Sequence, residues 1–384
     1  MPAIQTTCIG AYPKPDYVPI IDWFDQSEGA QDMSAKRATQ SYEQRLAEAG
    51  EEAESLFVRA ATEVIADQID CGIDIPTDGE VRRENYIHYH CRHFDGIDFV
   101  NLTQRLARDG ATYMESPTIT DAITARSGHF LPHDFKVAQA SSDRPLKITV
   151  PGPITIADTT ADKHYGDMKT LCRDLAVAIN YEVRALSEAG CRYIQIDEPL
   201  FARKPEQALA FGIENLERCF HGIGKHTTAV MHMCCGYPNY LDEEGYQKAD
   251  RQVYFDLANG LDDSIVAQIS IEDAHQHNDL ELLERFQRSS VIFGSFAVAS
   301  STVESLEQIR ERLKSALNHI DSDRLIAAPD CGLGLLGREL AMENCKSCAR
   351  PQKAYNLRPD IGISLLLQLH YAGDTGRYLV NAFE

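Results

Sequence analysis

Four residues that suit a metal ion recur in this sequence at the ends of apolar, β-rich runs. His232 and Cys234 end one run, Glu272 ends the next, and Cys331 ends the last. Residues two apart on a strand point to the same side, so His232 and Cys234 can face one ion, whereas Cys235 points away. Imidazole and thiolate ligands favour Zn²⁺ among the common ions. The sequence therefore predicts a zinc site with the ligands His232, Cys234, Glu272 and Cys331.

Zinc in this ligand set is better suited to activating a thiol than to activating water. A free thiol has a pKa of about 8.5, so little of it is thiolate at neutral pH, and coordination to zinc removes its proton. Two thiolates and a carboxylate make the metal electron-rich, which weakens it as a Lewis acid toward water but keeps a bound thiolate nucleophilic. The ligand set therefore favours S-alkylation over hydrolysis.

The candidate ligands lie in a repeating pattern of strands and helices. Segments with helical periodicity include 53–70, 168–190 and 303–320, and Gly72 and Gly190 stand where helix C-caps belong. The expected strands are 4–13, 72–80, 146–155, 192–199, 228–236, 264–273, 290–298 and 324–334. Eight strands joined by helical crossovers predict an α/β fold, a closed (β/α)₈ TIM barrel. Such barrels carry their active sites at the C-terminal strand ends, where the zinc candidates lie.

Residues 1–384 are expected to form a single barrel domain, because no low-complexity linker divides the chain. The segment 81–146 is about twice as long as a usual crossover. It predicts an insertion after strand two that covers the barrel mouth. Residues 341–384 are expected to form a C-terminal extension, whose apolar face closes the bottom of the barrel or makes a dimer contact.

Two further clusters of metal-binding residue types have more ordinary explanations. His88, His90 and His93 fall in the expected insertion, where a structural or solvent-facing role is favoured over supplying an acid or binding a substrate. Cys345 and Cys348 form an isolated C-x-x-C, which is weak evidence for a second zinc because no matching pair accompanies it.

Composition excludes several classes of partner. The 384 residues are 43% hydrophobic and 25% charged, as in soluble globular proteins, and the net charge of −21 disfavours binding to nucleic acid. No apolar stretch approaches the roughly 18 residues of a membrane span, and the N-terminus does not read as a secretory signal. Eleven scattered cysteines then indicate reduced thiols, so a cytoplasmic protein without membrane or nucleic-acid partners is expected.

Seven motifs together resemble a known family. The chain order TTCIGAYP, TDGEVRRENY, VPGPITI, IQIDEP, HMCCG, ISIED and APDCGL is similar to that of the C-terminal catalytic barrel of cobalamin-independent methionine synthases, in a short, single-barrel form. The resemblance covers residues 4–340. It implies a (β/α)₈ barrel that moves a methyl group from a methylated folate to the sulfur of homocysteine on zinc. The implied zinc ligands are again His232, Cys234, Glu272 and Cys331.

The resemblance also implies a homocysteine site. The backbone around Ile9, Gly10 and Ala11 and the carboxylates of Glu80 and Asp197 would hold this substrate, the two carboxylates by recognising its α-amine. Ala11 stands where the family motif usually has a serine. A contact through the backbone N–H would survive that replacement.

The methyl-donor side departs from the family pattern at three places. Thr159 stands near the position of a tryptophan that stacks on the folate, and the only tryptophan of the chain, Trp23, is expected elsewhere. Ala297 and Ala299 replace an aspartate and a proton-donating histidine, and Arg203 replaces a glutamate that contacts the folate. We therefore expect zinc-dependent methyl transfer to homocysteine, giving methionine, from a donor other than conventionally bound methyltetrahydrofolate. A methylated corrinoid protein, a sulfonium compound and an epoxide-like electrophile are the donors considered.

Two alternatives stay open. The first is a zinc-dependent alkyltransferase acting on another thiol, similar to the epoxyalkane–coenzyme M transferases. Glu80 and Asp197 count against it, because a sulfonate acceptor needs cationic residues. The second is a zinc- and thiol-binding subunit that needs a partner protein to deliver the methyl group, which also fits the changed donor side.

Overall fold

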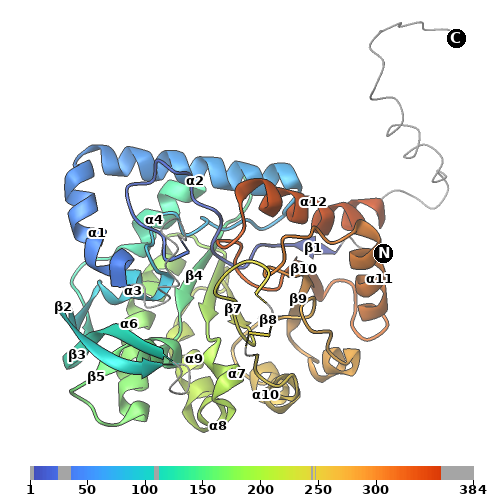
Figure 1. The fold of residues 1–384 in the computed structure, drawn as a ribbon. Coiled ribbons are helices and arrows are strands. Elements are labelled where there is room, and N and C mark those ends of the chain that lie inside the picture. The colour runs from blue at the N-terminus through green and yellow to red at the C-terminus, as the bar shows by residue number, and fades with distance from the viewer. Residues whose placement is uncertain (1–3, 25–35, 108–111, 244, 247, 356–384) are drawn as a thin grey trace, which may run out of the picture.

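The chain folds around a ring of short parallel strands, which Figure 1 shows at the centre of the molecule with helices around it. The computed structural model describes residues 4–24, 36–107, 112–243, 245–246 and 248–355. The strands of the main sheet are β1 (Gln5–Thr6), β4 (Lys147–Pro151), β6 (Tyr193–Asp197), β7 (Thr228–Met233), β8 (Gln268–Ile271), β9 (Ser290–Phe296) and β10 (Leu325–Pro329). They are hydrogen-bonded in the order β1-β10-β9-β8-β7-β6-β4, and every neighbouring pair is parallel.

Two isolated parallel bridges close this sheet into a barrel. Thr7 pairs with Ile75, and Thr77 pairs with Lys147, so residues 75–77 stand between β1 and β4 as the eighth strand. The expected strand at 72–80 is therefore present only as these bridges. The interior is filled by small and branched side chains, as in other barrels of this kind: Ile9, Val230, Ile292, Ile326 and Ala328. The prediction of a (β/α)₈ barrel is confirmed.

Helices cover the outside of the barrel. The expected segments 53–70, 168–190 and 303–320 correspond to α2 (Glu52–Cys71), α6 (Met168–Glu188) and α11 (Leu306–Ala316). Gly72 ends α2 in the left-handed conformation with φ 101°, and Gly190 follows α6 with φ 98°. The other helices are α1 (Lys36–Ala49), α4 (Leu131–Gln139), α5 (Pro153–Thr159), α7 (Leu200–Arg203), α8 (Pro205–Gln207), α9 (Ile213–Phe220), α10 (Gln252–Asp262) and α12 (Arg338–Tyr355), with short π and 3₁₀ turns η1 (Ala208–Gly212) and η2 (Leu280–Arg285).

After residues 75–77, the second barrel strand in chain order, the chain leaves the barrel and forms a small separate layer. This layer begins with α3 (Tyr86–Cys91) and continues as a hairpin of β2 (Phe94–Ala107) and β3 (Thr112–Ala125), which pairs onward with β5 (Ala161–Asp162). The chain then returns through α4, which is the ordinary crossover helix before β4. The departure from the barrel is therefore shorter than the expected 81–146.

The C-terminal helix α12 belongs to the helical layer of the barrel. Its residues Ala341, Cys345 and Cys348 are fully buried in the core, and both cysteines have free thiols. The expected start of the extension at residue 341 falls inside α12, whose apolar face packs on the barrel as the helix that follows β10. Residues 356–384 of the expected extension, and any contact they make, lie outside the described residues.

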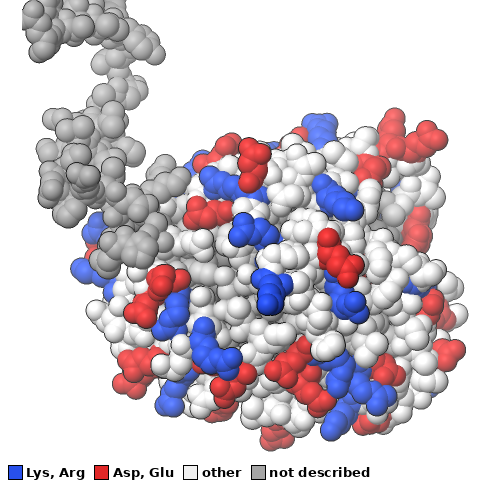
Figure 2. All heavy atoms as spheres, turned by 180° about the vertical axis from the view of Figure 1, so that it is seen from behind, with Lys and Arg blue, Asp and Glu red and all other residues white. Residues whose placement is uncertain are grey.

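The surface carries charges of both signs. Figure 2 shows acidic and basic side chains interspersed over the face opposite to that of Figure 1. None of the helices in the described ranges is long and apolar enough to cross a membrane.

Candidate active site

Three of the four expected zinc ligands converge where β7 and β10 end. Each of His232, Cys234 and Cys331 offers one ligand atom, and these atoms lie within 4.8 Å of one another. His232 Nε2 is 3.5 Å from Cys331 Sγ. Within the described part of the chain, this is the one cluster of three or more such residues that is compact enough to hold a metal ion. Cys235 is not part of it, as expected.

Glu272, the fourth expected ligand, ends β8 beside this group but lies outside the compact cluster. Its Oε2 pairs with Lys248 Nζ at 2.8 Å, whereas its Oε1 is buried and has no hydrogen-bond partner among the described residues. Burial, and then the charge of Cys234, raise the pKa of Glu272 well above its ordinary value. A buried carboxylate oxygen without a partner is costly, so this side chain fits a site that receives a cation.

The imidazole and the thiols are arranged to present lone pairs to one point. His232 Nδ1 lies 2.9 Å from Ser270 Oγ on β8. A proton on Nδ1, donated to the serine, leaves Nε2 free as a ligand. A hydrogen bond from the Cys331 thiol holds the pKa of Cys234 well below its usual range. One thiolate is therefore favoured in this cluster even without an ion.

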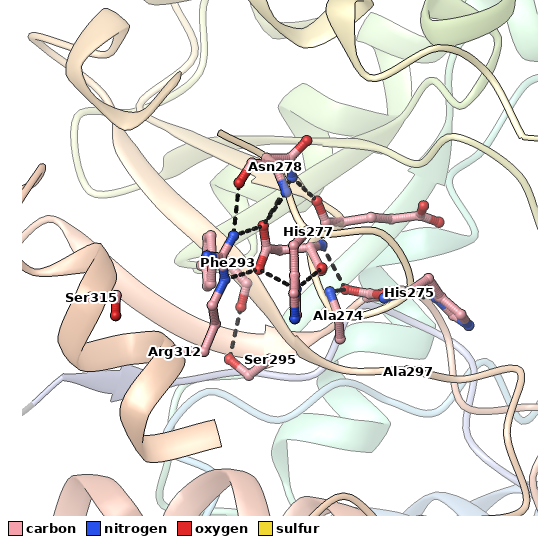
Figure 3. Close-up of polar contacts among 12 residues, drawn as sticks. Ala274, His275, His277, Asn278, Phe293, Ser295, Ala297, Arg312 and Ser315 are labelled. Carbon is pink, nitrogen blue, oxygen red and sulfur yellow. Dashed lines mark hydrogen bonds and ion pairs between the residues drawn. The ribbon is translucent and has the colours of Figure 1, made fainter. Parts of the chain in front are cut away.

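A polar network fixes the loops that carry the candidate ligands. The buried carboxylate of Asp330, next to Cys331, accepts the backbone N–H groups of residues 273–275 at 2.7–2.9 Å, so the loops after β8 and β10 are tied together. Figure 3 shows Arg312 of α11 and Asn278 turned toward the same loop. Arg312 binds the Asp273 carboxylate through two bonds of 2.6 and 2.8 Å. Such support holds ligands in place before the metal arrives.

A pocket of about 240 Å³ opens beside the cysteines at the mouth of the barrel. The five residues expected to hold homocysteine all line it: Ile9, Gly10, Ala11, Glu80 and Asp197. His232, Cys234 and Cys331 line the same pocket. A wider hollow of about 440 Å³ lies between α4 and the loop after α6, and its lining contains no cysteine or histidine.

Glu80 is held in an unusual conformation. Its φ of 57° is in the left-handed region, which costs a residue other than glycine about 1–3 kcal/mol and is found mainly at functional sites. Thr149 Oγ1 donates to its Oε1 at 2.6 Å, and the fully buried Arg83 lies 3.5 Å from it. A Cβ on Gly10 would lie 2.6 Å from the same oxygen, so this approach requires glycine.

Burial perturbs both carboxylates of the pocket. It raises the pKa of Glu80, and it raises the pKa of Asp197 to about 7. Asp197 Oδ1 accepts a hydrogen bond of 2.7 Å from Gln195, whose amide also binds the Ile9 carbonyl at 2.9 Å. Two desolvated carboxylates with raised pKa values in one pocket are suited to a cationic ligand group, whose charge would favour their ionised forms.

The opposite wall of the pocket is aromatic. Trp23 lies 4.7 Å from Phe24 and 5.8 Å from Tyr86 between ring centroids, and Phe24 lies 5.5 Å from Tyr237. All four rings line the pocket. Trp23 does not stand at the position of Thr159, as expected, but it lines the same pocket from the loop after β1. The backbone N–H of Trp23 donates to the Glu84 carbonyl at 2.9 Å.

The positions that depart from the family pattern fall into two groups. Thr159 and Arg203 line the pocket, and Arg203 is exposed. Ala297 and Ala299 do not line it. The Ala299 N–H instead donates to His275 Nε2 at 3.0 Å, and the other nitrogen of that ring lies 2.7 Å from Asp330.

The histidines of the insertion are structural. His88 Nδ1 pairs with Thr39 Oγ1 at 2.8 Å, His90 Nδ1 with the Tyr86 carbonyl at 2.8 Å, and His93 stacks on a phenylalanine ring. Burial lowers the pKa of His88 to about 3. None of the three lines the pocket. The structural role is confirmed, and the solvent-facing alternative is wrong for the buried His88 and His90.

Five residues that shape this site were not predicted from the sequence. Arg83 and Tyr86 lie within the motif TDGEVRRENY and Ser270 within ISIED, so their presence in these motifs was the available signal. Lys248 and Tyr237 lie outside the motifs, and only the folded chain brings them to Glu272 and the pocket wall.

Known proteins resemble this chain over most of its length. Residues 4–350 match the family described as cobalamin-independent synthase, catalytic domain. The chain is 28% identical over 355 residues to a methionine synthase of Saccharolobus solfataricus, covering 92% of this chain and 95% of that relative. It superposes with a TM-score of 0.78 and 26% identity on a B12-independent methionine synthase from Shewanella sp. W3-18-1 in complex with selenomethionine, covering 92% and 98% of the two chains. The chain therefore belongs to the cobalamin-independent synthase family and is an enzyme of the methyltransferase class.

Proposed function

We propose that this chain transfers a methyl group to the thiol of L-homocysteine and so forms methionine, with Zn²⁺ as its metal. The observation that carries the proposal is the convergence of His232, Cys234 and Cys331 on the wall of a pocket that also holds two buried carboxylates. The complex of the related Shewanella protein with selenomethionine supports an amino-acid thioether as the product.

His232, Cys234 and Cys331 would hold the zinc, with Glu272 as the fourth ligand through its unpartnered oxygen. Bound zinc would lower the pKa of the substrate thiol so that it reacts as a thiolate. Ser270 holds the imidazole in the tautomer with a free Nε2, and Lys248 keeps the Glu272 carboxylate beside the cluster. A weakly bound carboxylate of this kind can give way when a substrate sulfur arrives.

The pocket residues would bind and orient the amino acid. Glu80 and Asp197 receive the α-ammonium group, whose charge offsets the burial that raises their pKa values. Arg83 and Thr149 hold Glu80 in place, and the backbone of Ile9, Gly10 and Ala11 forms the adjoining wall. Fixing the sulfur beside the donor supplies the proximity that such transfers require.

The two alternatives predict different experimental results. An acceptor carrying a sulfonate would meet Glu80 and Asp197, which repel it. A subunit that depends on a partner protein would bind zinc and homocysteine but transfer nothing alone. All eleven cysteines have free thiols, so the proposal includes a reducing, cytoplasmic location.

The test is to count zinc by metal analysis and to titrate the purified protein with L-homocysteine while recording proton release. We expect one zinc per chain and about one proton released on binding. Cys331→Ser should lose zinc and homocysteine binding together, whereas Cys235→Ser, one residue from a ligand, should keep both. Unchanged zinc content in Cys331→Ser would refute the metal site, and zinc without homocysteine binding would favour another thiol.

A further inference from the structure

The pocket has two chemically different walls, and the aromatic wall has no role in holding zinc or the amino acid. Trp23, Phe24, Tyr86 and Tyr237 form a continuous arc of rings with centroid separations of 4.7–5.8 Å. Gly334 makes room for it, because a Cβ there would lie 2.5 Å from the Phe24 ring. The backbone at Gly334 is therefore shaped to accommodate the Phe24 ring of the arc.

The arc lies beside the thiol cluster and the carboxylates of the pocket. Burial, and then the charge of Asp197, raise the pKa of Tyr86 well above its usual value. Tyr237 donates its hydroxyl to the Gly332 carbonyl at 2.9 Å, next to Cys331. Aromatic faces attract an organic cation more strongly than a neutral group of the same shape.

The pocket lacks a free acid for a leaving group. Glu80 and Asp197 are committed to the substrate ammonium, and Asp158, the third carboxylate of the lining, forms an ion pair with Lys204. His232, Cys234 and Cys331 belong to the metal cluster. The remaining acids of the described lining are the phenols of Tyr86 and Tyr237, and burial raises both pKa values well above the usual range, so a donor whose departing heteroatom needs no proton fits best.

One cation of the lining is available for a donor carboxylate. Arg203 is exposed at the pocket and forms no hydrogen bond or ion pair with any described residue. Arg105, the other guanidinium, is already bound to the carbonyls of Asp158 and Thr160. The pocket of about 240 Å³ opens to solvent, so a small donor fits beside the amino acid, whereas a larger donor would have to project out of the mouth.

We propose that the methyl donor is a small methyl-onium carboxylate, a zwitterion whose sulfonium or quaternary ammonium centre lies against the Trp23–Phe24–Tyr86–Tyr237 arc and whose carboxylate meets Arg203. The thiolate sulfur of homocysteine attacks one methyl carbon of the onium centre. The bond from that methyl to the donor heteroatom breaks, and its electron pair stays on the heteroatom. The demethylated donor leaves with an uncharged thioether sulfur or tertiary amine nitrogen and keeps its carboxylate, so no proton is needed. This inference rests on the proposed methyl transfer to homocysteine.

The test uses the full-length, zinc-loaded protein with L-homocysteine and dimethylsulfonioacetate. Mass spectrometry should detect methionine and methylthioacetate in equal amounts. Trimethylammonioacetate, the nitrogen analogue, should compete for the site and transfer more slowly, because an amine is a poorer leaving group than a thioether. 3-Methylbutanoate, the isostere of dimethylsulfonioacetate that keeps the carboxylate but lacks the cationic centre, should compete at least about 5-fold more weakly.

Two variants test which residues bind the onium centre and the carboxylate of the donor. Trp23→Leu should raise the KM for dimethylsulfonioacetate by about 5- to 30-fold and leave homocysteine binding unchanged, while Tyr181→Leu, an exposed ring on α6, should change neither. Arg203→Gln should raise the same KM but should not affect trimethylsulfonium, which has no carboxylate. Arg184→Gln, on the outer surface, is the matched control.

The outcomes separate this inference from the function on which it rests. A preparation that binds zinc and homocysteine but shows neither methyl transfer from dimethylsulfonioacetate nor preference for it over 3-methylbutanoate overturns the onium donor alone. Transfer that appears only with a methylated protein also overturns it. A preparation that binds neither zinc nor homocysteine refutes the proposed function, and with it this inference.

Discussion

The two walls of the pocket are built from different parts of the fold. The thiol wall comes from strand ends: His232 and Cys234 follow β7, Glu272 follows β8, and Cys331 follows β10. The aromatic wall comes from loops and from the layer outside the barrel, which supply Trp23, Phe24 and Tyr86. The two walls come from different elements but share one pocket, and Tyr237, which donates to the Gly332 carbonyl, links the aromatic wall to the loop of Cys331.

This difference explains which chemistry the barrel fixes and which it leaves variable. Strand ends are held by the hydrogen bonds of the sheet and by networks such as that of Asp330 and Arg312. Loops on the same scaffold can change sequence and path without disturbing the barrel. A family can thus keep one thiol site and change its methyl donor. If the walls are independent, substitutions in one should leave the ligand of the other unaffected.

The largest expected effect comes from removing a metal ligand of the thiol wall. His232→Ala should lose zinc and lower the rate of methionine formation by about 1,000-fold or more, because thiol activation and placement of the sulfur are lost together. Metal analysis and turnover measurements check this. His319→Ala, whose ring pairs with Glu284 on the surface, should retain full zinc and activity. Full zinc in His232→Ala would show that the cluster has been misassigned.

Glu80→Gln should weaken homocysteine binding without removing zinc. Loss of a charge-assisted contact costs about 1.5–3 kcal/mol, which corresponds to an increase of about 10- to 100-fold in Kd. Calorimetry with L-homocysteine measures the change, and the surface variant Glu214→Gln serves as its control. An unchanged Kd would mean that the ammonium group is bound elsewhere, and a changed donor KM would mean that the two walls are coupled.

The same division explains how much of the site could be predicted from the sequence. The thiol wall was predictable because each candidate ends an apolar run, and the barrel brings strand ends to one opening. That Trp23 reaches the pocket was not predicted, because no periodic pattern governs the path of its loop. That path depends on a backbone bond to Glu84 and on space left by Gly334, 311 residues away in a different strand–helix unit.

The fold shows the same limit at its weaker elements. The strand at 72–80 reads clearly in the sequence but forms only two bridges, at Ile75 and Thr77. The local hydrophobic pattern also does not predict that α12 covers the barrel, because the burial of this helix arises from packing against α2 and β10. In both cases tertiary contacts decide what the pattern leaves open.

A smaller effect is expected from a substitution of Ser270, whose hydroxyl contacts the imidazole of His232. Ser270→Ala removes the partner of His232 Nδ1 and should weaken zinc binding by about 10- to 100-fold, while turnover with saturating zinc changes little. Competition with a zinc-binding dye measures the affinity, and Ser315→Ala on α11 is the control. Unchanged zinc affinity would mean that the sheet alone orients the imidazole.

The smallest effect should come from a single methyl group added behind the aromatic wall. In Gly334→Ala the new Cβ would lie 2.5 Å from the Phe24 ring, so the ring must move and the arc loses part of its contact with the donor. The donor KM should rise by about 3- to 10-fold, with homocysteine Kd and zinc content unchanged. Gly337→Ala, which meets no atom within 4 Å, should leave all three at wild-type values. A parallel loss of homocysteine binding in Gly334→Ala, but not in Gly337→Ala, would show that the arc also positions the thiol substrate, because Gly332 and Ala11 lie next to the same turn.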